Sequence, residues 1–201
     1  MSDIRWHPQS VARGERAERV GHVGATIWMT GLSGSGKSTI ANEAARILFA
    51  AGANAYVLDG DNLRHGLNSD LGFSDADRAE NVRRCGEVAL TLADAGLVVL
   101  APLISPFAAG RNAVRRRHHD AGVPFAEVFV ATPLRECAER DPKGLYAKQQ
   151  NGELTGLTGV DAPYEAPESP ELLLVTSNRS VGDCAAELVS ALSRLWKTDI
   201  R

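Results

Sequence analysis

The stretch Gly31-Leu32-Ser33-Gly34-Ser35-Gly36-Lys37-Ser38 matches the pattern G-x-x-x-x-G-K-[ST] at every fixed position. A short apolar run, residues 25–30, comes before it, and apolar residues recur at helical spacing from Ile40 to Leu48 after it. The sequence therefore predicts a strand, a glycine-rich loop and a helix in direct succession. Glycines let such a loop turn its backbone N–H groups towards phosphate oxygens, and the helix N-terminus points to the same place. We expect a nucleoside triphosphate site there.

Two side chains of this loop have distinct expected roles. We expect Lys37 to hold the β- and γ-phosphates of ATP and Ser38 to bind Mg²⁺. The alternative, an ordinary glycine turn that fits the pattern by chance, is disfavoured by the strand and helix patterns on either side. The expected ATP-binding residues of the loop are Gly31, Leu32, Ser33, Gly34, Ser35, Gly36, Lys37, Ser38 and Thr39.

The composition is typical of one soluble globular domain. The chain has 201 residues, of which 44% are hydrophobic and 23% charged. Its net charge of −3 gives no general attraction to nucleic acid or to an anionic membrane. We therefore expect no nucleic acid and no membrane among the partners, and any basic site must be local.

The cysteines and the apolar runs bear on location. Cys85, Cys137 and Cys184 stand 52 and 47 residues apart, which matches no zinc spacing and leaves one unpaired in any disulfide scheme. No apolar signal core follows the first residues, and the longest apolar stretch, 97–104, is far shorter than the roughly 18 residues that span a bilayer. We expect a cytoplasmic protein.

Strand and helix patterns alternate along the chain. After the first strand, apolar runs at 55–58, 97–101, 126–130 and 171–175 read as strands, with helices predicted between them and a closing helix from Val181. Such alternation predicts an α/β fold, a three-layer arrangement with a parallel five-stranded sheet covered on both faces. We expect an N-terminal arm over residues 1–24, which is either a loosely ordered tail or a contact with a partner, and a single domain over residues 25–201.

Two carboxylates, Asp59 and Asp61, follow the second predicted strand. Ligands of open α/β sheets bind at the carboxyl ends of the strands. We therefore expect these side chains to serve Mg²⁺ or a substrate hydroxyl, although a turn and a helix cap would use the same residues.

Basic residues cluster on two predicted helices. Arg78 and Asn81 share one face in the first turn of a helix that Ser74 is expected to cap, where they would face either a ligand or solvent. The helix beginning near Ala108 carries a basic run that reads as a solvated face, although Arg111 and Arg115 are spaced to reach phosphate from one side.

A long segment rich in glycine and proline, residues 141–165, has little apolar periodicity. A loop of this length inside a compact domain is usually functional or disordered. Near a nucleotide site we interpret it as a lid.

Several segments together resemble the adenylyl-sulfate kinase (APS kinase) family, and the resemblance extends from about Gly24 to the last helix. Beside the phosphate loop, the segments that carry it are 59–64 (DGDNLR), 70–74 (DLGFS), 77–84 (DRAENVRR), 104–107 (ISPF), 140–146 (RDPKGLY) and 163–165 (PYE). The resemblance implies a fold similar to that of nucleoside monophosphate kinases. It implies transfer of the γ-phosphoryl of ATP to the 3′-hydroxyl of adenylyl sulfate, giving 3′-phosphoadenylyl sulfate in sulfate assimilation.

The resemblance also implies site residues and partners. It places Cys184 near the adenine of ATP, and it implies Mg²⁺ as cofactor, a homodimer, and a sulfurylase as a possible partner. Carried over position by position, the residues that it places against adenylyl sulfate are Asp61, Arg64, Phe73, Arg78, Asn81, Ile104, Ser105 and Lys143, with Gly156 and Leu157 closing from the lid.

Physical chemistry agrees with this placement. Arg64, Arg78 and Lys143 would balance a phosphosulfate through charge-assisted hydrogen bonds, and an aromatic ring such as Phe73 would stack on adenine. Phosphoryl transfer needs mostly positioning and charge stabilisation. The expected catalytic residues are Lys37, Asp61, which would orient or deprotonate the 3′-hydroxyl, and Ser105; the expected metal ligands are Ser38 and Asp59.

Two positions need separate comment. Leu157 occupies a lid position that is usually phenylalanine in the family, so stacking on that side is expected to become a weaker apolar contact. Ser105 stands where the family is described with a phosphoserine intermediate. A serine needs an activating base to be a good nucleophile, and no histidine lies nearby in sequence. We expect direct in-line transfer, with Ser105 binding the substrate.

Two other functions fit part of the sequence. A phosphate-loop kinase could act on another small metabolite, such as a nucleoside monophosphate or a sugar acid, and comparing turnover of adenylyl sulfate with that of AMP separates the two. A regulatory nucleotide-binding module would bind nucleotide tightly without catalysis, and its binding would be insensitive to Asp61→Ala.

Overall fold

Five parallel strands form one sheet in the order β2-β3-β1-β4-β5 in the computed structural model, which describes residues 5 and 7–196. This confirms the predicted α/β fold. Residues 1–4 and 6 of the expected arm, and residues 197–201 of the expected domain, lie outside the described residues. The strands are β1 (Ala25–Thr30), β2 (Ala55–Val57), β3 (Val98–Pro102), β4 (Phe125–Val130) and β5 (Leu172–Leu174).

Strand β1 is the central strand and positions the phosphate loop. All six of its residues are buried, and it pairs with β3 and β4, with Ala25 opposite Val98 and Thr26 opposite Phe125. A run of apolar and β-branched residues is typical of a parallel strand that is covered on both faces. The loop that follows β1 therefore leaves the sheet at the middle of its carboxyl edge.

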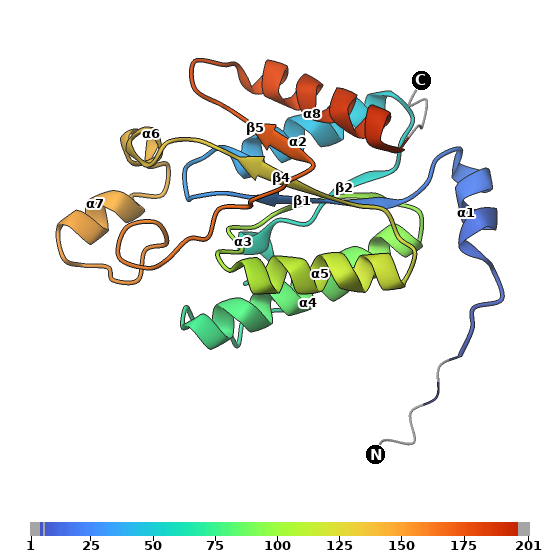
Figure 1. The fold of residues 1–201 in the computed structure, drawn as a ribbon, viewed down its shortest axis with the longest axis horizontal. Coiled ribbons are helices and arrows are strands. Elements are labelled where there is room, and N and C mark those ends of the chain that lie inside the picture. Colours follow the sequence, from blue (N-terminus) through green and yellow to red (C-terminus); the bar gives the residue numbers. More distant parts are fainter. Residues whose placement is uncertain (1–4, 6, 197–201) are drawn as a thin grey trace.

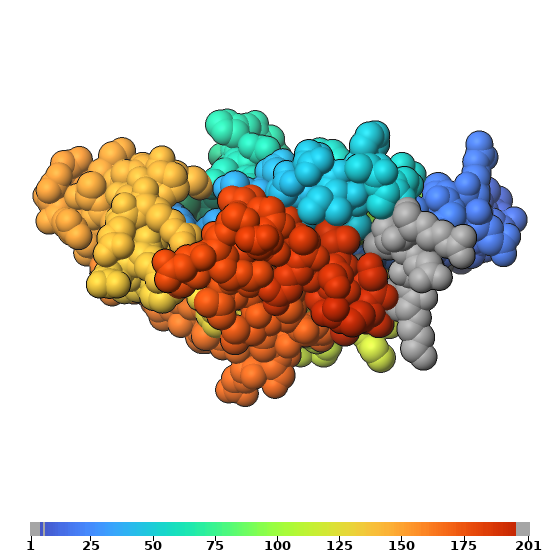
Figure 2. All heavy atoms as spheres, turned by 90° about the horizontal axis from the view of Figure 1, so that it is seen from above, coloured from blue at the N-terminus to red at the C-terminus, as the bar shows by residue number. Residues whose placement is uncertain are grey.

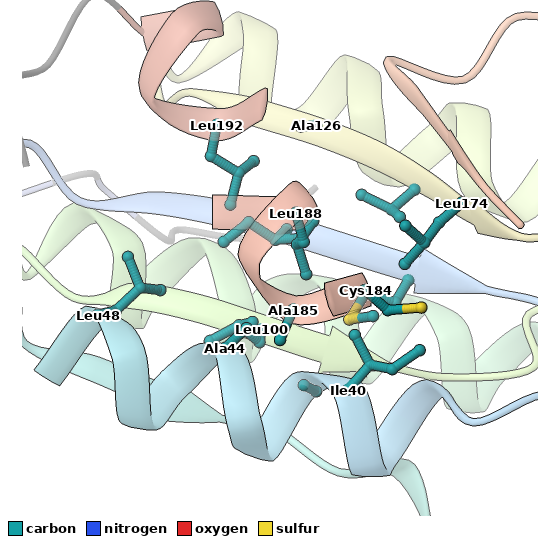
Figure 3. Packing of buried hydrophobic residues seen from close by; sticks show 14 of the residues in the cluster. Ile40, Ala44, Leu48, Leu100, Ala126, Leu174, Cys184, Ala185, Leu188 and Leu192 are labelled. Carbon is teal, nitrogen blue, oxygen red and sulfur yellow. The ribbon is translucent and has the colours of Figure 1, made fainter. Parts of the chain in front are cut away.

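Helices cover both faces of the sheet (Figure 1). Helices α2 (Lys37–Ala50) and α8 (Val181–Trp196) lie on one face, and α4 (Asp75–Asp94) and α5 (Ala108–Asp120) lie on the other. Between α2 and α8, Ala44 and Leu48 of α2 pack near Leu188 of α8 on one face of the sheet (Figure 3). This apolar layer holds the first turn of α2, and with it the phosphate loop, in a fixed place.

The second apolar layer lies under α4 and α5. Trp28 of β1 is fully buried there, among residues that include Cys85 and Ala89 of α4. Gly86 lets the two helices approach closely, because a Cβ at this position would stand 2.6 Å from Val114 of α5. Helix α4 begins as predicted, with the Ser74 hydroxyl accepting a hydrogen bond from the Asp77 backbone N–H.

Four short helices complete the fold. They are α1 (Arg13–Val20), α3 (Gly60–Leu63), α6 (Leu134–Arg140) and α7 (Leu145–Gln150), of which α7 lies inside the segment expected to be a lid. Figures 1 and 2 place α6 and α7 at one end of the molecule and α1 at the other. Among the helices of residues 5 and 7–196, none combines the length and the apolar character that a membrane span requires.

Helix α1 gives the expected arm a defined place on the surface. It has no buried residue, but Arg16 donates to Asp94 Oδ2 at 2.7 Å and Arg13 donates to the Ala121 carbonyl at 2.6 Å. These contacts join the helix to the ends of α4 and α5. The docked segment lies away from the carboxyl edge of the sheet.

The basic run on α5 is a solvated face only in part, because Arg116, Arg117 and His119 are exposed as predicted but other members of the run are not. Arg111 is 2% exposed and His118 is fully buried. Arg111 pairs with Glu127 of β4 at 2.6 Å, and Arg115 pairs with both Glu127 and Glu171. Because Arg111 and Arg115 face these carboxylates, they do not line the cleft described below, and the suggestion that they reach phosphate is wrong.

Candidate active site

A cleft of about 980 Å³ opens at the carboxyl edge of the sheet. It runs from the phosphate loop and α8, which we call the donor end, to α3, α4 and the loop after β3, which we call the acceptor end. The predicted residues that line it are Ser33, Gly34, Ser35, Gly36, Lys37, Ser38, Thr39, Asp61, Arg64, Phe73, Arg78, Asn81, Ile104, Ser105, Lys143, Gly156, Leu157 and Cys184. Gly31, Leu32 and Asp59 stand directly behind this lining, in contact with Lys37 or Ser38.

The phosphate loop has the backbone that its glycines allow. Gly34 and Gly36 adopt positive φ values of 75° and 98°, and a Cβ on Gly34 would stand 2.8 Å from the Cys137 carbonyl oxygen. Gly36 precedes the first turn of α2, and no described side chain caps that end of the helix. The N–H groups of the first turn are therefore free to bind an anion.

Lys37 is buried in the loop that it follows. Its ammonium donates to the carbonyl oxygens of Gly31 at 2.9 Å and Leu32 at 2.7 Å. Burial lowers the pKa of Lys37 from 10.5 to about 8, with a further lowering contribution from Lys143. Burial therefore destabilises the charged form of Lys37, and the negative charge of a triphosphate bound in the loop would offset this effect.

Ser38 and Asp59 meet beneath the loop. The Ser38 hydroxyl donates to Asp59 Oδ2 at 2.7 Å, while Asp59 Oδ1 accepts the backbone N–H groups of Asp61 and Asn62 and so caps α3. The two readings of Asp59, helix cap and metal ligand, are thus compatible, since one oxygen serves the cap and the other faces Ser38. Mg²⁺ prefers oxygen ligands and commonly takes one or two from protein beside phosphates and water. No cluster of three or more His, Cys, Asp or Glu side chains suited to a metal occurs in the described part of the chain, and the Ser38–Asp59 pair fits the smaller requirement.

Asp61 and Lys143 face each other across the cleft. The Lys143 ammonium forms an ion pair with Asp61 Oδ2, and both side chains are more than half exposed. Asp61 lies in α3, and Lys143 lies just before α7, so the pair links the acceptor end to the start of the expected lid. A carboxylate next to an exposed cation is suited to orient a hydroxyl group.

Phe73 presents an exposed ring at the acceptor end. The ring is 69% exposed, and the guanidinium of Arg64 lies over it at 4.3 Å from the centroid. Arg64 also donates to the carbonyl oxygens of Leu71 and Gly72. The guanidinium therefore stiffens the loop that carries Phe73 and adds positive charge beside the ring.

Arg78 and Asn81 extend from the first turns of α4 in different directions. Arg78 donates to the Gly156 carbonyl at 2.6 Å and to the Thr158 hydroxyl at 2.5 Å, so it joins α4 to the expected lid. Asn81 is 9% exposed and contacts the buried amide of Asn68 at 3.0 Å. Neither side chain is merely solvated.

Ser105 has an unusual backbone and a crowded side chain. Its φ is 40°, a left-handed value that is rare for a non-glycine residue, and it is 3% exposed. Its hydroxyl accepts from the Trp28 indole N–H at 3.1 Å and donates to the Leu103 carbonyl at 3.4 Å. No histidine or carboxylate of the described residues contacts this hydroxyl, so the geometry offers it no general base.

The segment expected to be a lid packs against the phosphate loop. Leu157 is 6% exposed and forms a small apolar cluster with Cys137 and Tyr146, and the Tyr146 hydroxyl donates to the Ser33 carbonyl at 2.9 Å. Leu157 thus both lines the cleft and anchors the lid. Burial raises the pKa of Tyr146 to about 12, so its hydroxyl remains a donor.

The donor end contains Cys184, which was expected there, and several residues that the sequence did not predict. Cys184 is buried near Ile40 on the inner side of α8 (Figure 3), and burial raises the pKa of its thiol, which leaves it an apolar wall. Thr176 lies two residues after the end of β5, and the rule that ligands lie beyond the carboxyl ends of strands could have found it. The further lining residues there are Arg140, Thr176, Arg179 and Val181.

Comparisons with known proteins agree on one family. A family model described as Adenylylsulphate kinase matches residues 23–175. An adenylyl-sulfate kinase of Bacillus licheniformis is 54% identical over 187 residues, which cover 93% of this chain and 94% of that protein. The solved structure of the Mycobacterium tuberculosis APS kinase CysC in complex with AMPPNP and APS is similar with a TM-score of 0.83 at 56% identity, covering 85% of this chain and 98% of that one.

Some relatives are longer. The bifunctional enzyme NodQ of a Rhizobium species is 55% identical over 190 residues, which cover 94% of this chain. The matched part is 28% of that enzyme, so the chain corresponds to one portion of it.

Proposed function

The chain belongs to the adenylyl-sulfate kinase family, whose members move the γ-phosphoryl of ATP to the 3′-hydroxyl of adenylyl sulfate, and we propose how the residues of the cleft divide this reaction. The observation that carries the proposal is the single cleft. It joins a phosphate loop at one end to a ring, three cations and a carboxylate at the other. The related kinase of known structure binds AMPPNP and APS, an arrangement that needs such a two-ended site.

The donor end binds ATP. The loop N–H groups and the first turn of α2 bind the phosphates, and Lys37 balances the charge of the β- and γ-phosphates. Ser38 and Asp59 would hold Mg²⁺, which would supply charge neutralisation at those phosphates. Cys184 and Val181 provide apolar surface for the adenine.

The acceptor end binds adenylyl sulfate. Phe73 stacks on the adenine, and Arg64, Arg78 and Lys143 balance the phosphosulfate. Asp61 orients the 3′-hydroxyl and accepts its proton as the phosphoryl group arrives. Lys143, now paired with Asp61, exchanges this partner for the anionic substrate, which leaves the carboxylate available.

Ser105 binds substrate and does not carry the phosphoryl group. The support is its hydrogen bonding, since Trp28 and Leu103 occupy the hydroxyl and no base among the described residues contacts it. Direct in-line transfer from ATP to the 3′-hydroxyl requires no activated serine.

Assembly and location form a further part of the proposal. A homodimer follows from the family resemblance. Fusion of this unit with another in a relative such as NodQ supports cooperation with a separate enzyme, and we propose a sulfurylase that makes adenylyl sulfate. Three buried cysteines without disulfides suit a reducing, cytoplasmic location.

A product assay tests the proposed reaction. Purified protein with ATP, Mg²⁺ and adenylyl sulfate should form ADP and the 3′-phosphorylated product in equal amounts, and replacing adenylyl sulfate with AMP should abolish turnover. Comparable turnover of AMP would favour a nucleoside monophosphate kinase. Tight ATP binding by a folded protein without any product would favour a regulatory module.

Acid quenching during turnover tests direct transfer. With γ-labelled ATP the protein should remain unlabelled, both for the native chain and for Ser105→Ala. Stoichiometric label on the native chain that is lost in Ser105→Ala would contradict direct transfer.

A further inference from the structure

We propose that Arg111, a buried residue of α5 that does not line the cleft, is a positioning residue for the acceptor end. It holds the backbone of Ser105 and ties it to the base of the lid at Glu165. The inference rests on the proposed function, because it assigns a task in binding adenylyl sulfate. It adds a residue that touches no substrate in that scheme.

The guanidinium makes three hydrogen bonds in three directions. Nη1 donates to the Ser105 carbonyl at 2.8 Å, Nη2 donates to the Glu165 carbonyl at 2.7 Å, and Nε donates to Glu127 Oε1 at 2.6 Å. Glu127 belongs to β4, in the rigid centre of the sheet. A charged group anchored on the sheet therefore holds two segments, at Ser105 and at Glu165, that are 60 residues apart in the chain.

Ser105 needs these contacts because its backbone conformation is strained. At a φ of 40° a residue with a Cβ is strained, and such strain persists only where the surroundings over-determine the conformation. Two side chains hold this residue, the Arg111 guanidinium on its carbonyl and the Trp28 indole on its hydroxyl. The strained turn directs the Ile104–Ser105 segment into the cleft.

The neighbouring residues repeat the same connection. The Ile104 carbonyl accepts from the Thr30 hydroxyl at 2.6 Å, and the Thr30 hydroxyl lies 3.0 Å from that of Tyr164. Consecutive carbonyls of the loop after β3, which we call the acceptor loop (103–107), are thus linked to consecutive residues at the base of the lid, 164–165. The Glu165 backbone N–H also donates to the Pro106 carbonyl at 2.9 Å. The acceptor loop and the lid base form one connected unit, and the Arg111 guanidinium supplies its positive charge.

Lysine cannot replace the guanidinium in this role. Its single nitrogen cannot reach three acceptors that lie in different directions, whereas the planar fork of arginine does so with little loss of side-chain freedom. The substitution Arg111→Lys keeps the buried positive charge beside Glu127 and removes the fork. It therefore separates positioning from charge.

The experiment measures KM for each substrate separately. Arg111→Lys should raise KM for adenylyl sulfate by at least about 10-fold, because small misplacements of a binding loop have large effects, and should change KM for ATP by less than about twofold. Arg115→Lys is the matched control. Arg115 lies one turn later and also pairs with Glu127, but its ion pairs are with Glu127 and Glu171 rather than with the acceptor loop or the lid. It should leave both KM values near those of the native chain.

A second variant covers the case in which Arg111→Lys does not fold. Arg111→Met combined with Glu127→Gln removes both buried charges together, which proteins often tolerate. This pair should show the same selective rise in KM for adenylyl sulfate. A folded variant of either kind with both KM values unchanged, or with equal rises for both substrates, would overturn the proposal.

Glycine at position 105 gives the sharpest test. Glycine adopts positive φ without strain, so in a Ser105→Gly background the rise in KM caused by Arg111→Lys should shrink by about fivefold or more. Equal rises in both backgrounds would contradict the positioning role. Failure of the proposed function is recognised separately, since the native chain and Arg115→Lys would then both be inactive towards adenylyl sulfate.

Discussion

The Ser38 hydroxyl lies 2.7 Å from Asp59 Oδ2, which joins the first turn of α2 to the residue that caps α3. The contact links the donor end of the cleft to Asp61, two residues further along the chain. Ser38 and Asp59 would hold a metal ion, which would supply charge neutralisation at the phosphates. In the proposed division of the site, one short segment, 59–61, would serve both substrates.

Asp59→Asn tests the metal site without removing the helix cap, because asparagine caps helices as well as aspartate does. The concentration of Mg²⁺ that gives half-maximal activity should rise by about 10- to 100-fold, as is typical when metal-site partners are changed. A Mg²⁺ titration of activity checks this, with the thermal midpoint as a control for the cap. An unchanged titration would remove Asp59 from the metal site.

Lys37→Met should abolish turnover while the fold persists. The side chain is the cation expected to balance the transferring phosphoryl group, and methionine fills a similar volume without charge. The product assay gives the activity, and circular dichroism shows whether the fold is retained. Activity within about tenfold of the native value would refute the assigned role.

The same variant should be more stable than the native chain below about pH 8. Burial depresses the pKa of Lys37 to about 8, so in this range the charged group is present in both states and destabilises the folded one. By linkage the penalty is up to about 3 kcal/mol, reduced by the hydrogen bonds that Lys37 makes to the loop carbonyls.

Denaturant unfolding over a range of pH measures this difference. Between about pH 8 and 10.5 the unfolded chain binds more protons at Lys37 than the folded one, so the native chain gains stability as pH rises through this window. The advantage of Lys37→Met should shrink over the same window. An advantage that is constant with pH would contradict the depressed pKa.

Asp61→Asn should lower kcat by at least about 10²-fold, the usual effect of losing a proton-transfer group. The loss of its ion pair with Lys143 should affect stability little, because both side chains are more than half exposed. ATP affinity, measured by calorimetry, should stay unchanged. Asp75→Asn, at an exposed carboxylate in the first turn of α4, is the control and should keep native activity.

Leu157→Phe should tighten binding of adenylyl sulfate, since a ring at this lid position would face Phe73 across the adenine. It should also lower the thermal midpoint slightly, because the larger side chain must fit beside Cys137 and Tyr146. Calorimetry with adenylyl sulfate and with a nonhydrolysable ATP analogue separates the two sites. Weaker or equal binding of adenylyl sulfate would count against the stacking argument.

Local patterns predicted much of the fold. The apolar run of β1, the serine cap of α4 and the closing helix α8 each follow from a few adjacent residues, and all three occur where expected. Helix α1 escaped prediction because no apolar stripe marks it. Its docking depends on Arg13 and Arg16 reaching residues about 80 to 110 positions away.

The basic run on α5 shows most clearly what sequence patterns could not predict. In sequence, Arg111 and Arg115 differ little from solvated arginines, since charge runs are usually exposed. The burial of Arg111 and the partial burial of Arg115 depend on Glu127, in β4, and Glu171, which directly precedes β5. Only the pairing of those strands beside α5 brings the carboxylates within reach.

By itself the sequence determined the phosphate loop, the parallel sheet and the residue types of the cleft, because glycine placement, apolar periodicity and spacing along a helix act between near neighbours. The tertiary structure alone decided which of these side chains face the cleft and which support it. Ser105 and Arg111 stand six residues apart in the chain. Ser105 lines the cleft, whereas Arg111 lies behind the lining and donates to the Ser105 carbonyl. The physical reason is that a buried charge or a strained turn is stable only where distant segments supply its partners.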